Sequence, residues 1–85
     1  MLRWEWDNTL TDGSLTCEIT RARKDDGKYL FSFCIERNLE NGRVSKRMRP
    51  MDFALQHALL KKAERYIIDR QMEEKAKMKK SKRNA

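Results

Sequence analysis

The fold is decided by residues 15–35, LTCEITRARKDDGKYLFSFCI, in which apolar and polar residues alternate on both sides of one turn. Alternation with a period of two is typical of β-strands. The turn, Asp25-Asp26-Gly27, is typical of a three-residue hairpin loop with glycine in the left-handed position. Such a loop pairs Ile19 with Phe33 and Cys17 with Ile35, so that apolar residues of both strands share one face. The stretch therefore predicts an antiparallel hairpin.

Two further turn signals extend this hairpin into a four-stranded antiparallel meander. Asp12-Gly13 and Asn41-Gly42 are typical of two-residue hairpin loops, because both residues tolerate positive φ. Loops of this length predict the pairs Leu10–Leu15, Trp6–Ile19 and Trp4–Arg21 at the first turn, and Leu39–Val44 and Ile35–Met48 at the third.

The three registers agree on one apolar face, and they place the two cysteines on opposite faces, where they cannot bond to each other. They also pair Glu36 with Arg47 across two strands. The predicted apolar face carries Leu2, Trp4, Trp6, Leu10, Leu15, Cys17, Ile19, Tyr29, Phe31, Phe33, Ile35, Val44 and Met48. The predicted polar face carries Arg3, Glu5, Asp7, Thr16, Glu18, Thr20, Ser32, Cys34, Glu36, Arg43, Ser45, Arg47 and Arg49.

A long helix is predicted after the sheet. Arg49-Pro50 ends the fourth strand, because proline has no N–H for a ladder, and Asp52 suits an N-cap or first-turn position. Neither glycine nor proline interrupts residues 53–72, where helix-forming residues dominate. Lys61, Lys62, Arg65 and Asp69 lie opposite a predicted apolar stripe of Phe53, Leu55, Leu59, Leu60, Ala63, Tyr66 and Ile67.

Each of these elements needs the other to cover its apolar side, so we expect the helix to lie on the apolar face of the sheet. The predicted fold class is α+β, a ββββα arrangement. Residues 1–72 form the predicted domain, and residues 73–85 form a basic helical extension or tail.

Length and composition narrow the class of protein. A chain of 85 residues has room for one domain, and no apolar run is long enough to span a membrane or to act as a signal core. We therefore expect an intracellular, cytoplasmic protein. Two cysteines are too few for a disulfide framework, and no Cys or His cluster offers a zinc site.

The net charge of +7 is unevenly spread. Residues 1–20 carry one base and four acids, residues 21–50 nine bases and four acids, and residues 51–85 ten bases and five acids. A basic field of this kind attracts nucleic acid, anionic lipid or an acidic protein surface. Solubility alone is the alternative explanation.

The sequence shows no catalytic constellation. His57 is the single histidine and is more typical of a packing or surface residue than of a catalyst. Cys34 has no neighbouring base to lower its pKa, and the glycines form no nucleotide-binding loop. We expect neither an enzyme nor a bound cofactor or metal.

Basic residues suited to phosphate contacts are the candidate site, since such contacts provide affinity without sequence choice. They form a fourth-strand group, a group flanking the middle turn, and a C-terminal tail. Protection of an edge strand and complementation of the helix dipole are the alternative roles. The aromatic residues can stack bases, but the predicted register favours core packing for them. The candidate residues are Arg43, Lys46, Arg47, Arg49, Arg21, Arg23, Lys24, Lys28, Lys75, Lys77, Lys79, Lys80, Lys82 and Arg83.

The run from Gly27 to Arg37, the Asn41-Gly42 turn, the basic segment 45–49 and the amphipathic helix together resemble the positive cofactor 4-like family of single-stranded DNA-binding transcription coactivators. The resemblance implies a sheet and basic loops that cradle single strands, with helices that help to build a dimer. The small, highly charged, tail-bearing chain also looks like accessory proteins of tailed phages, which often act by binding a host or viral enzyme.

The leading hypothesis is a non-enzymatic nucleic-acid-binding accessory protein, with single-stranded nucleic acid slightly favoured. The alternative is a protein-binding modulator or inhibitor that docks on an acidic surface of an enzyme. A homodimer through the helix is a third hypothesis.

Overall fold

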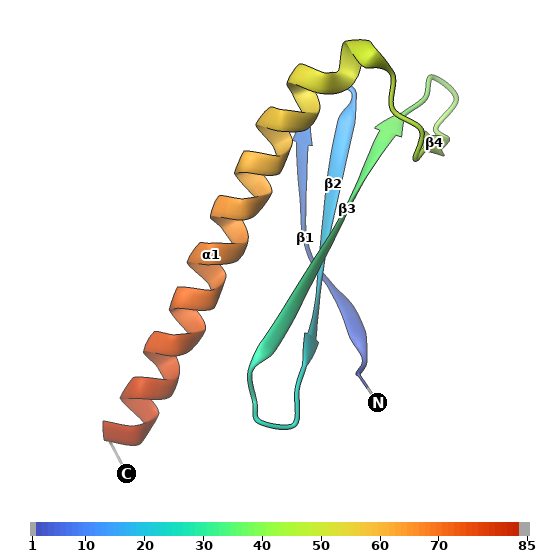
Figure 1. Ribbon diagram of the computed structural model, residues 1–85. Helices are drawn as coiled ribbons and strands as arrows, with labels where there is room; N and C mark the ends of the chain where they lie inside the picture. The colour runs from blue at the N-terminus through green and yellow to red at the C-terminus, as the bar shows by residue number, and fades with distance from the viewer. Residues whose placement is uncertain (1, 84–85) are drawn as a thin grey trace.

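The computed structural model describes the backbone of residues 2–83 and the side chains of residues 2–77, and it confirms the ββββα fold. Strands β1 (Trp4–Asp12), β2 (Leu15–Arg23), β3 (Tyr29–Asn38) and β4 (Val44–Ser45) form an antiparallel sheet in the order β1-β2-β3-β4. A 3₁₀ turn, η1 (Pro50–Asp52), leads into the single helix α1 (Phe53–Arg83), which crosses one face of the twisted sheet (Figure 1). Within the described residues, no helix has the length and apolar character needed to cross a membrane.

The middle hairpin has the predicted register. Ile19 pairs with Phe33 and Cys17 with Ile35, and the loop Asp25-Asp26-Gly27 is closed by a hydrogen bond from the Lys24 N–H to the Lys28 carbonyl oxygen, at 2.8 Å.

The first turn differs from the prediction by one position. Asp12 pairs with Leu15, so the loop is Gly13-Ser14, and Leu10 lies opposite Cys17 rather than Leu15. Gly13 has φ +58°, and no other residue near this turn has positive φ. A loop with positive φ only at its first residue is the type II′ turn, whereas the predicted loop needs positive φ at both residues. This change moves the pairing by two residues in total, so it leaves the faces unchanged.

A β-bulge at Asp7 reverses the predicted face of the two tryptophans. Asn8 pairs with Ile19, but Trp6 pairs with Thr20 and Trp4 with Ala22. Asp7 is therefore an extra residue in β1 that has no pairing partner in β2. A single extra residue exchanges the sides of every residue beyond it. Trp4 and Trp6 therefore lie on the face that α1 does not cover, here called the open face, and the prediction that they are core residues is wrong.

The fourth strand is much shorter than predicted. The pairs Asn38–Val44 and Arg37–Ser45 enclose a three-residue loop, Glu40-Asn41-Gly42, because only Gly42 has positive φ. This one-residue difference places Val44 on the open face, where it is 53% exposed. The predicted pairs of Leu39 with Val44 and of Ile35 with Met48 are therefore wrong.

The basic segment after Ser45 leaves the ladder. Residues 46–49 are outside the sheet, so Arg47 does not pair with Glu36, which lies opposite Thr16 in β2. Arg43, Lys46, Arg47 and Arg49 are thus residues of a loop and of the corner before η1, not of an edge strand.

The core lies between the covered face of the sheet and α1. Leu59 and Ala63 of the helix pack on the fully buried Leu15, Cys17 and Ile19 of β2. Partly buried residues surround this cluster: Leu10, Phe31, Ile35, Met48, Leu55, Tyr66 and Ile67.

Two aromatic residues predicted to be covered are exposed. Phe53, at the start of α1, is 62% exposed, and Phe33 in β3 is 50% exposed. Phe33 does lie on the covered face, opposite Ile19, but beside a hollow that the helix leaves open.

The corner between sheet and helix is fixed by Asp52, whose side chain is buried. Its carboxylate accepts hydrogen bonds from the backbone N–H of Arg49 at 2.8 Å and from the Arg49 side chain at 3.2 Å. The Arg49 side-chain bonds, followed by its backbone N–H, lower the pKa of Asp52. From this corner α1 continues without a break to Arg83, about 46 Å of helix against about 33 Å for the longest strand.

Candidate nucleic-acid interface

The open face presents two tryptophan rings. Trp4 is 47% exposed and Trp6 is 60% exposed, and they lie about 7 Å apart along β1 because they are two residues apart in one strand. Most of the other side chains on this face are short or polar. They are Thr9, Thr11, Thr16, Glu18, Thr20, Ala22, Leu30, Ser32, Cys34, Glu36, Asn38 and Val44, as the strand pairing places them.

The bulge that turns the tryptophans outward is held by the side chain of Asp7. This carboxylate is only 4% exposed, and it lies on the covered face, under α1. It accepts a hydrogen bond from the Tyr66 hydroxyl at 2.5 Å and lies 3.5 Å from Arg70, both on the helix, and 3.3 Å from Arg21 of β2. Burial, followed by the hydrogen bond to Asp7, raises the pKa of Tyr66, so its hydroxyl stays a donor. A buried charge with three partners ties the irregular point of β1 to the helix.

The ring of Trp6 is held in place by its own polar atom. Its indole N–H donates to the Thr9 hydroxyl at 2.8 Å, across the bulge on the same face. Since this donor is satisfied within the strand, the flat faces of the ring are available for contact with a partner.

The end of the open face near the middle turn combines apolar and basic side chains. Leu2 and Leu30 lie beside the position of Trp4, which pairs with Ala22, the neighbour of Leu30. Together with Lys24, Asp25 and Asp26 the two leucines line a shallow hollow of about 470 Å³.

The predicted basic residues of the middle turn differ in their availability. Arg21 is bound to Glu5 at 2.9 Å and to Asp7, so it belongs to the bulge network. Arg23 lies 5.9 Å from the ring centre of Tyr29, and Arg21 lies over the same ring at 4.9 Å. Trp4 is therefore not the cation–π partner of Arg21.

Two lysines of this turn remain toward solvent. Lys24 is 3.7 Å from Asp26, a weak pair because both side chains are largely exposed. Lys28 has no acidic side chain within salt-bridge distance among the described residues. The pKa of Asp26 is lowered mainly by the backbone N–H of Lys28, which holds the loop closed.

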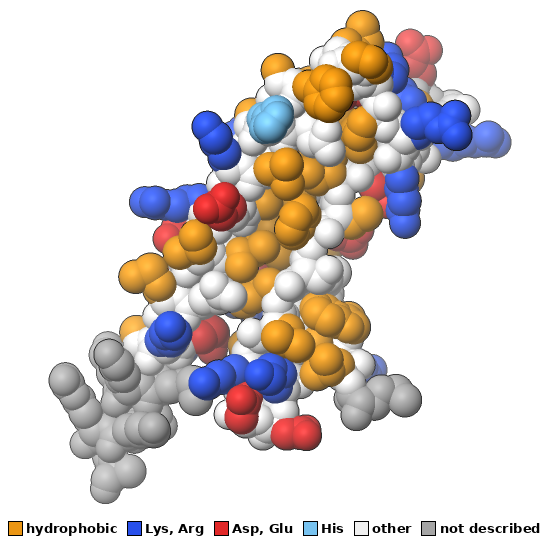
Figure 2. Space-filling view, in the orientation of Figure 1, with side chains coloured by type: hydrophobic (Ala, Val, Ile, Leu, Met, Phe, Trp, Pro, Cys, Tyr) orange, Lys and Arg blue, Asp and Glu red, His pale blue; other side chains and the backbone are white. Residues whose placement is uncertain are grey.

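The predicted fourth-strand residues gather at the other end of the sheet, beside β4 (Figure 2). Arg43, Lys46 and Arg47 are exposed, and none of them has an acidic partner in the described part of the chain. Arg49 instead binds Asp52. This group thus lies near the β4 end of the sheet, whereas Trp4 pairs with Ala22 near the opposite end.

The predicted C-terminal residues are described only in part. Lys75 and Lys77 are exposed on α1, and Lys77 lies 3.9 Å from Glu74. The side chains of Lys79, Lys80, Lys82 and Arg83 lie outside the described residues.

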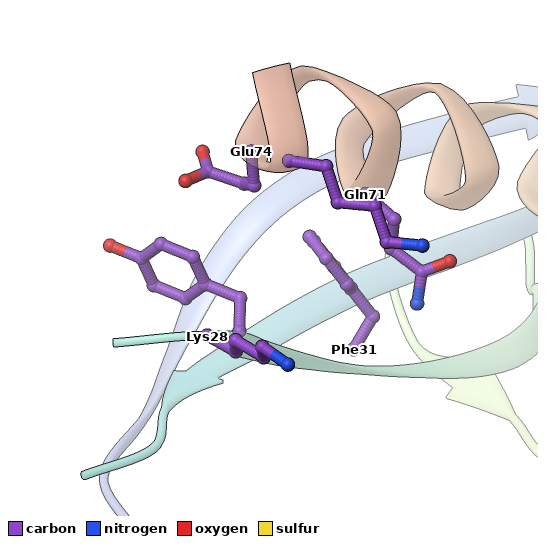
Figure 3. A pocket seen from close by; sticks show the side chains of 6 residues that line it. Lys28, Phe31, Gln71 and Glu74 are labelled. Atoms are coloured by element: carbon purple, nitrogen blue, oxygen red, sulfur yellow. The ribbon is translucent and has the colours of Figure 1, made fainter. Parts of the chain in front are cut away.

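A second hollow, of about 250 Å³, opens between β3 and the C-terminal half of α1 (Figure 3). Phe31 and Tyr29 form its sheet side, and Gln71 and Glu74 form its helix side, with Lys28 at the rim. It contains one carboxylate and no nucleophile–base pair, so it offers no arrangement for catalysis.

The two thiols are free and lie on opposite faces, as predicted. Cys17 is buried, and burial, with Cys34 as a second cause, raises the pKa of its thiol. His57 is exposed on the helix. The described residues contain no group of three or more His, Cys, Asp or Glu side chains placed to hold a metal ion.

Comparison of the chain with protein-family models, with curated proteins and with solved structures finds no match.

Sequence reasoning missed the residues that define the open face, Trp4, Trp6 and Asp7. One signal was present. Arg21 stands at a position whose neighbours Cys17 and Ile19 are buried, and an arginine on a covered face needs an acid beside it. Asn8 is likewise a polar residue at a position predicted to be apolar.

Proposed function

We propose that this protein binds single-stranded nucleic acid on the open face of its sheet, with Trp4 and Trp6 stacking on bases. The observation that carries the proposal is the exposure of both rings, maintained by a buried Asp7 that interrupts an otherwise regular strand. β-Bulges are common at sheet edges and next to functional sites, where they re-aim a side chain.

Charge supports an anionic partner. The net charge is +7, and several basic side chains have no acidic partner among the described residues. A positive surface beside aromatic rings is the usual combination in proteins that bind single strands, because phosphates supply affinity and every base has a face that can stack. The proposed phosphate contacts are basic side chains that lack an acidic partner. The basic side chains without such a partner are Arg3, Arg23, Lys28, Arg43, Lys46, Arg47, Lys61 and Lys75.

The shape of the surface supports a single strand over a duplex. The rings project from a broad sheet face with no helix or long loop beside them that fits a groove, and the bases of a duplex are already stacked on each other. Unpaired bases can lie flat on the rings. The proposed binding uses stacking on the rings and not hydrogen bonds to the edges of the bases, so we expect little sequence preference.

Intrinsic fluorescence provides a direct test, because Trp4 and Trp6 are the two tryptophans of the chain. Titration with a single-stranded oligonucleotide is expected to quench this fluorescence, with much weaker quenching by the matching duplex. Binding is expected to fall steeply with salt, since each phosphate contact contributes about 0.7 to the slope of log affinity against log salt for single strands.

Variants locate the site. Trp6→Ala is expected to lower the affinity by roughly 5- to 150-fold, the effect of losing one stacked base. Phe53→Ala is the matched control, because Phe53 is equally exposed but lies at the start of α1. Fluorescence anisotropy with a labelled oligonucleotide measures both variants. Equal affinities of the two variants, or no binding by the wild type at low salt, would contradict the proposal.

A second candidate function is the binding of a protein partner on the same face. The observation that favours it is the apolar group around Trp4, since Leu2 and Leu30 are also exposed and leucine contributes nothing to base stacking. Clusters of tryptophan with apolar neighbours are typical of protein interfaces. Leu30→Ala discriminates the two functions: it should leave oligonucleotide affinity unchanged if bases stack on the tryptophans alone.

A further inference from the structure

The outer edge of β3 lacks a neighbouring strand over most of its length. β4 pairs only with Arg37 and Asn38, so residues 29–36 have β2 on one side and, in the described part of the chain, no strand on the other. Such an edge presents a row of backbone donors and acceptors that can pair with another strand.

The strand pairing identifies which groups point outward. The Asn38 N–H donates to the Ser14 carbonyl oxygen, and the Lys24 N–H donates to the Lys28 carbonyl oxygen, so even-numbered residues of β3 are hydrogen-bonded to β2. In an antiparallel ladder the odd-numbered residues then point their N–H and C=O groups to the free edge. No hydrogen bond to these outward groups is found among the described residues. They belong to Tyr29, Phe31, Phe33 and Ile35.

The free edge has little of the usual protection against pairing. Residues 29–36 include no proline, and their single charged residue is Glu36 at one end, whereas edge strands that stay single usually carry proline or charges. The side chain of Phe33 is 50% exposed at this edge.

The helix extends this exposed apolar region. Phe33 lines a groove of about 400 Å³ with Leu60, Ala63, Ile67 and Ile68 of α1, and Ile68 is itself 43% exposed. Figure 2 shows hydrophobic side chains gathered along the junction of the helix and the sheet. An apolar groove beside an unpaired strand is a surface that a second strand with its own helix would cover.

We propose that the free edge of β3 pairs with the same edge of a second copy of this chain, antiparallel, around a two-fold axis at Ser32. This register pairs Tyr29 with Ile35 of the second copy and Phe31 with its Phe33, so all four outward residues of each copy are hydrogen-bonded. Centring on Phe31 leaves Ile35 unpaired, and centring on Phe33 requires Arg37, which already pairs with β4. Ser32 is the centre that leaves no outward group without a partner.

Charge supports a second copy rather than an unrelated strand. Lys28 and Glu36 lie four residues on either side of Ser32, so the register places each lysine opposite the glutamate of the other copy. A two-fold interface requires such self-complementarity, because each surface meets itself.

A cysteine at the axis tests the register directly. Across an antiparallel pair without hydrogen bonds the Cα atoms are about 4.5 Å apart, within the range of a disulfide. In a Cys34→Ser background, Ser32→Cys is expected to form an intermolecular disulfide under mild oxidation. Thr20→Cys is the control, because Thr20 pairs with Ser32 from the inner strand β2 and cannot reach a second copy. Absence of the Ser32→Cys disulfide, or equal yields from the two variants, would overturn the proposed register.

Mass measurements test the edge itself. Wild-type protein is expected to show twice the chain mass in sedimentation equilibrium, and Phe33→Lys to show the mass of one chain. A monomeric wild type at millimolar concentration overturns the proposal.

Because Phe33→Lys can also unfold the chain, a charge exchange provides a second readout. Glu36→Lys should weaken dimerisation by roughly 2- to 30-fold, and adding Lys28→Glu should restore it. No restoration by the double variant would contradict the pairing of these two charges.

Dimerisation does not depend on the proposed nucleic-acid binding, and the two can fail separately. Trp6→Ala is expected to keep the dimer mass while losing oligonucleotide affinity. If Trp6→Ala lost both, the interface would lie on the open face and not at the edge of β3.

Discussion

The two faces of the sheet are made from the same strands but have opposite relations to solvent. On the covered face, Leu15, Cys17 and Ile19 are fully buried beneath Leu59, whereas on the open face Trp4 and Trp6 are about half exposed. Tryptophan is the larger apolar residue, so burial by size alone would have placed it inside. The position of each ring is instead set by the backbone, through one extra residue in β1.

The largest expected difference between the two faces is in stability. Leu59→Ala should lower the free energy of unfolding by about 2–5 kcal/mol, because it opens a cavity in the core. Trp6→Ala should lower it by less than about 1 kcal/mol, since the ring is mostly exposed. Chemical denaturation of both variants measures the contrast. A larger loss for Trp6→Ala would mean that the open face is covered in the folded protein.

The second largest loss of unfolding free energy is expected from removing the Asp7 carboxylate at the bulge. Asp7→Ala leaves Tyr66, Arg21 and Arg70 without their shared partner, and we expect a loss of about 2–4 kcal/mol in unfolding free energy. Glu5→Ala is the control, because its pair with Arg21 is exposed and should contribute less than about 1 kcal/mol. If the two variants were equally stable, the buried carboxylate would not be what holds the bulge.

A substitution in the first turn should cause a smaller loss of unfolding free energy. Gly13→Ala forces an alanine into φ +58° and places its Cβ 3.1 Å from Leu55 of α1, so we expect a loss of about 1–2 kcal/mol. Gly27→Ala has similar backbone strain but open space around it, and should cost less. Thermal unfolding of the two variants isolates the contact between turn and helix. A greater loss for Gly27→Ala would contradict it.

Acidification should have the smallest effect. The folded pKa of Asp52 lies below its ordinary value of 3.8, so its contribution to stability is present above about pH 4 and is lost as the pH falls through the folded pKa. Asp52→Asn should therefore be less stable than wild type at neutral pH and should approach it at low pH. Asp26→Asn is measured beside it, since the pKa of Asp26 is lowered too. A constant difference between wild type and Asp52→Asn at all pH values would show that Asp52 acts by shape alone.

The parts of the fold that could be predicted are those set by local chemistry. In the middle turn, a three-residue loop ending at Gly27 is the length that keeps the apolar residues of both strands on one face, and this loop gave the correct pairing of β2 with β3. The end of the strand region before Pro50 and the helix that follows were also predictable, because both depend on neighbouring residues in the sequence.

The bulge could not be predicted in this way, because it depends on contacts between distant parts of the chain. The partners of Asp7 on the helix, Tyr66 and Arg70, are 59 and 63 residues away. In sequence, Asp7 is an ordinary polar residue in an alternating strand, and alternation alone assigns it to the solvent side. The candidate site shows the same contrast. Its basic residues could be predicted from the sequence, whereas the exposure of the two tryptophans depends on the bulge and was found only in the structure.

The extra residue at Asp7 makes the length of β1 as important as its composition. Removing one residue between Trp6 and Asn8 would restore an even count and rotate the whole N-terminal end of the chain by half a turn about the strand axis. Both indoles would then point at the helix, and their neighbours would point away. Related chains that differ by one residue at this point would carry the same side chains on the opposite side of the molecule.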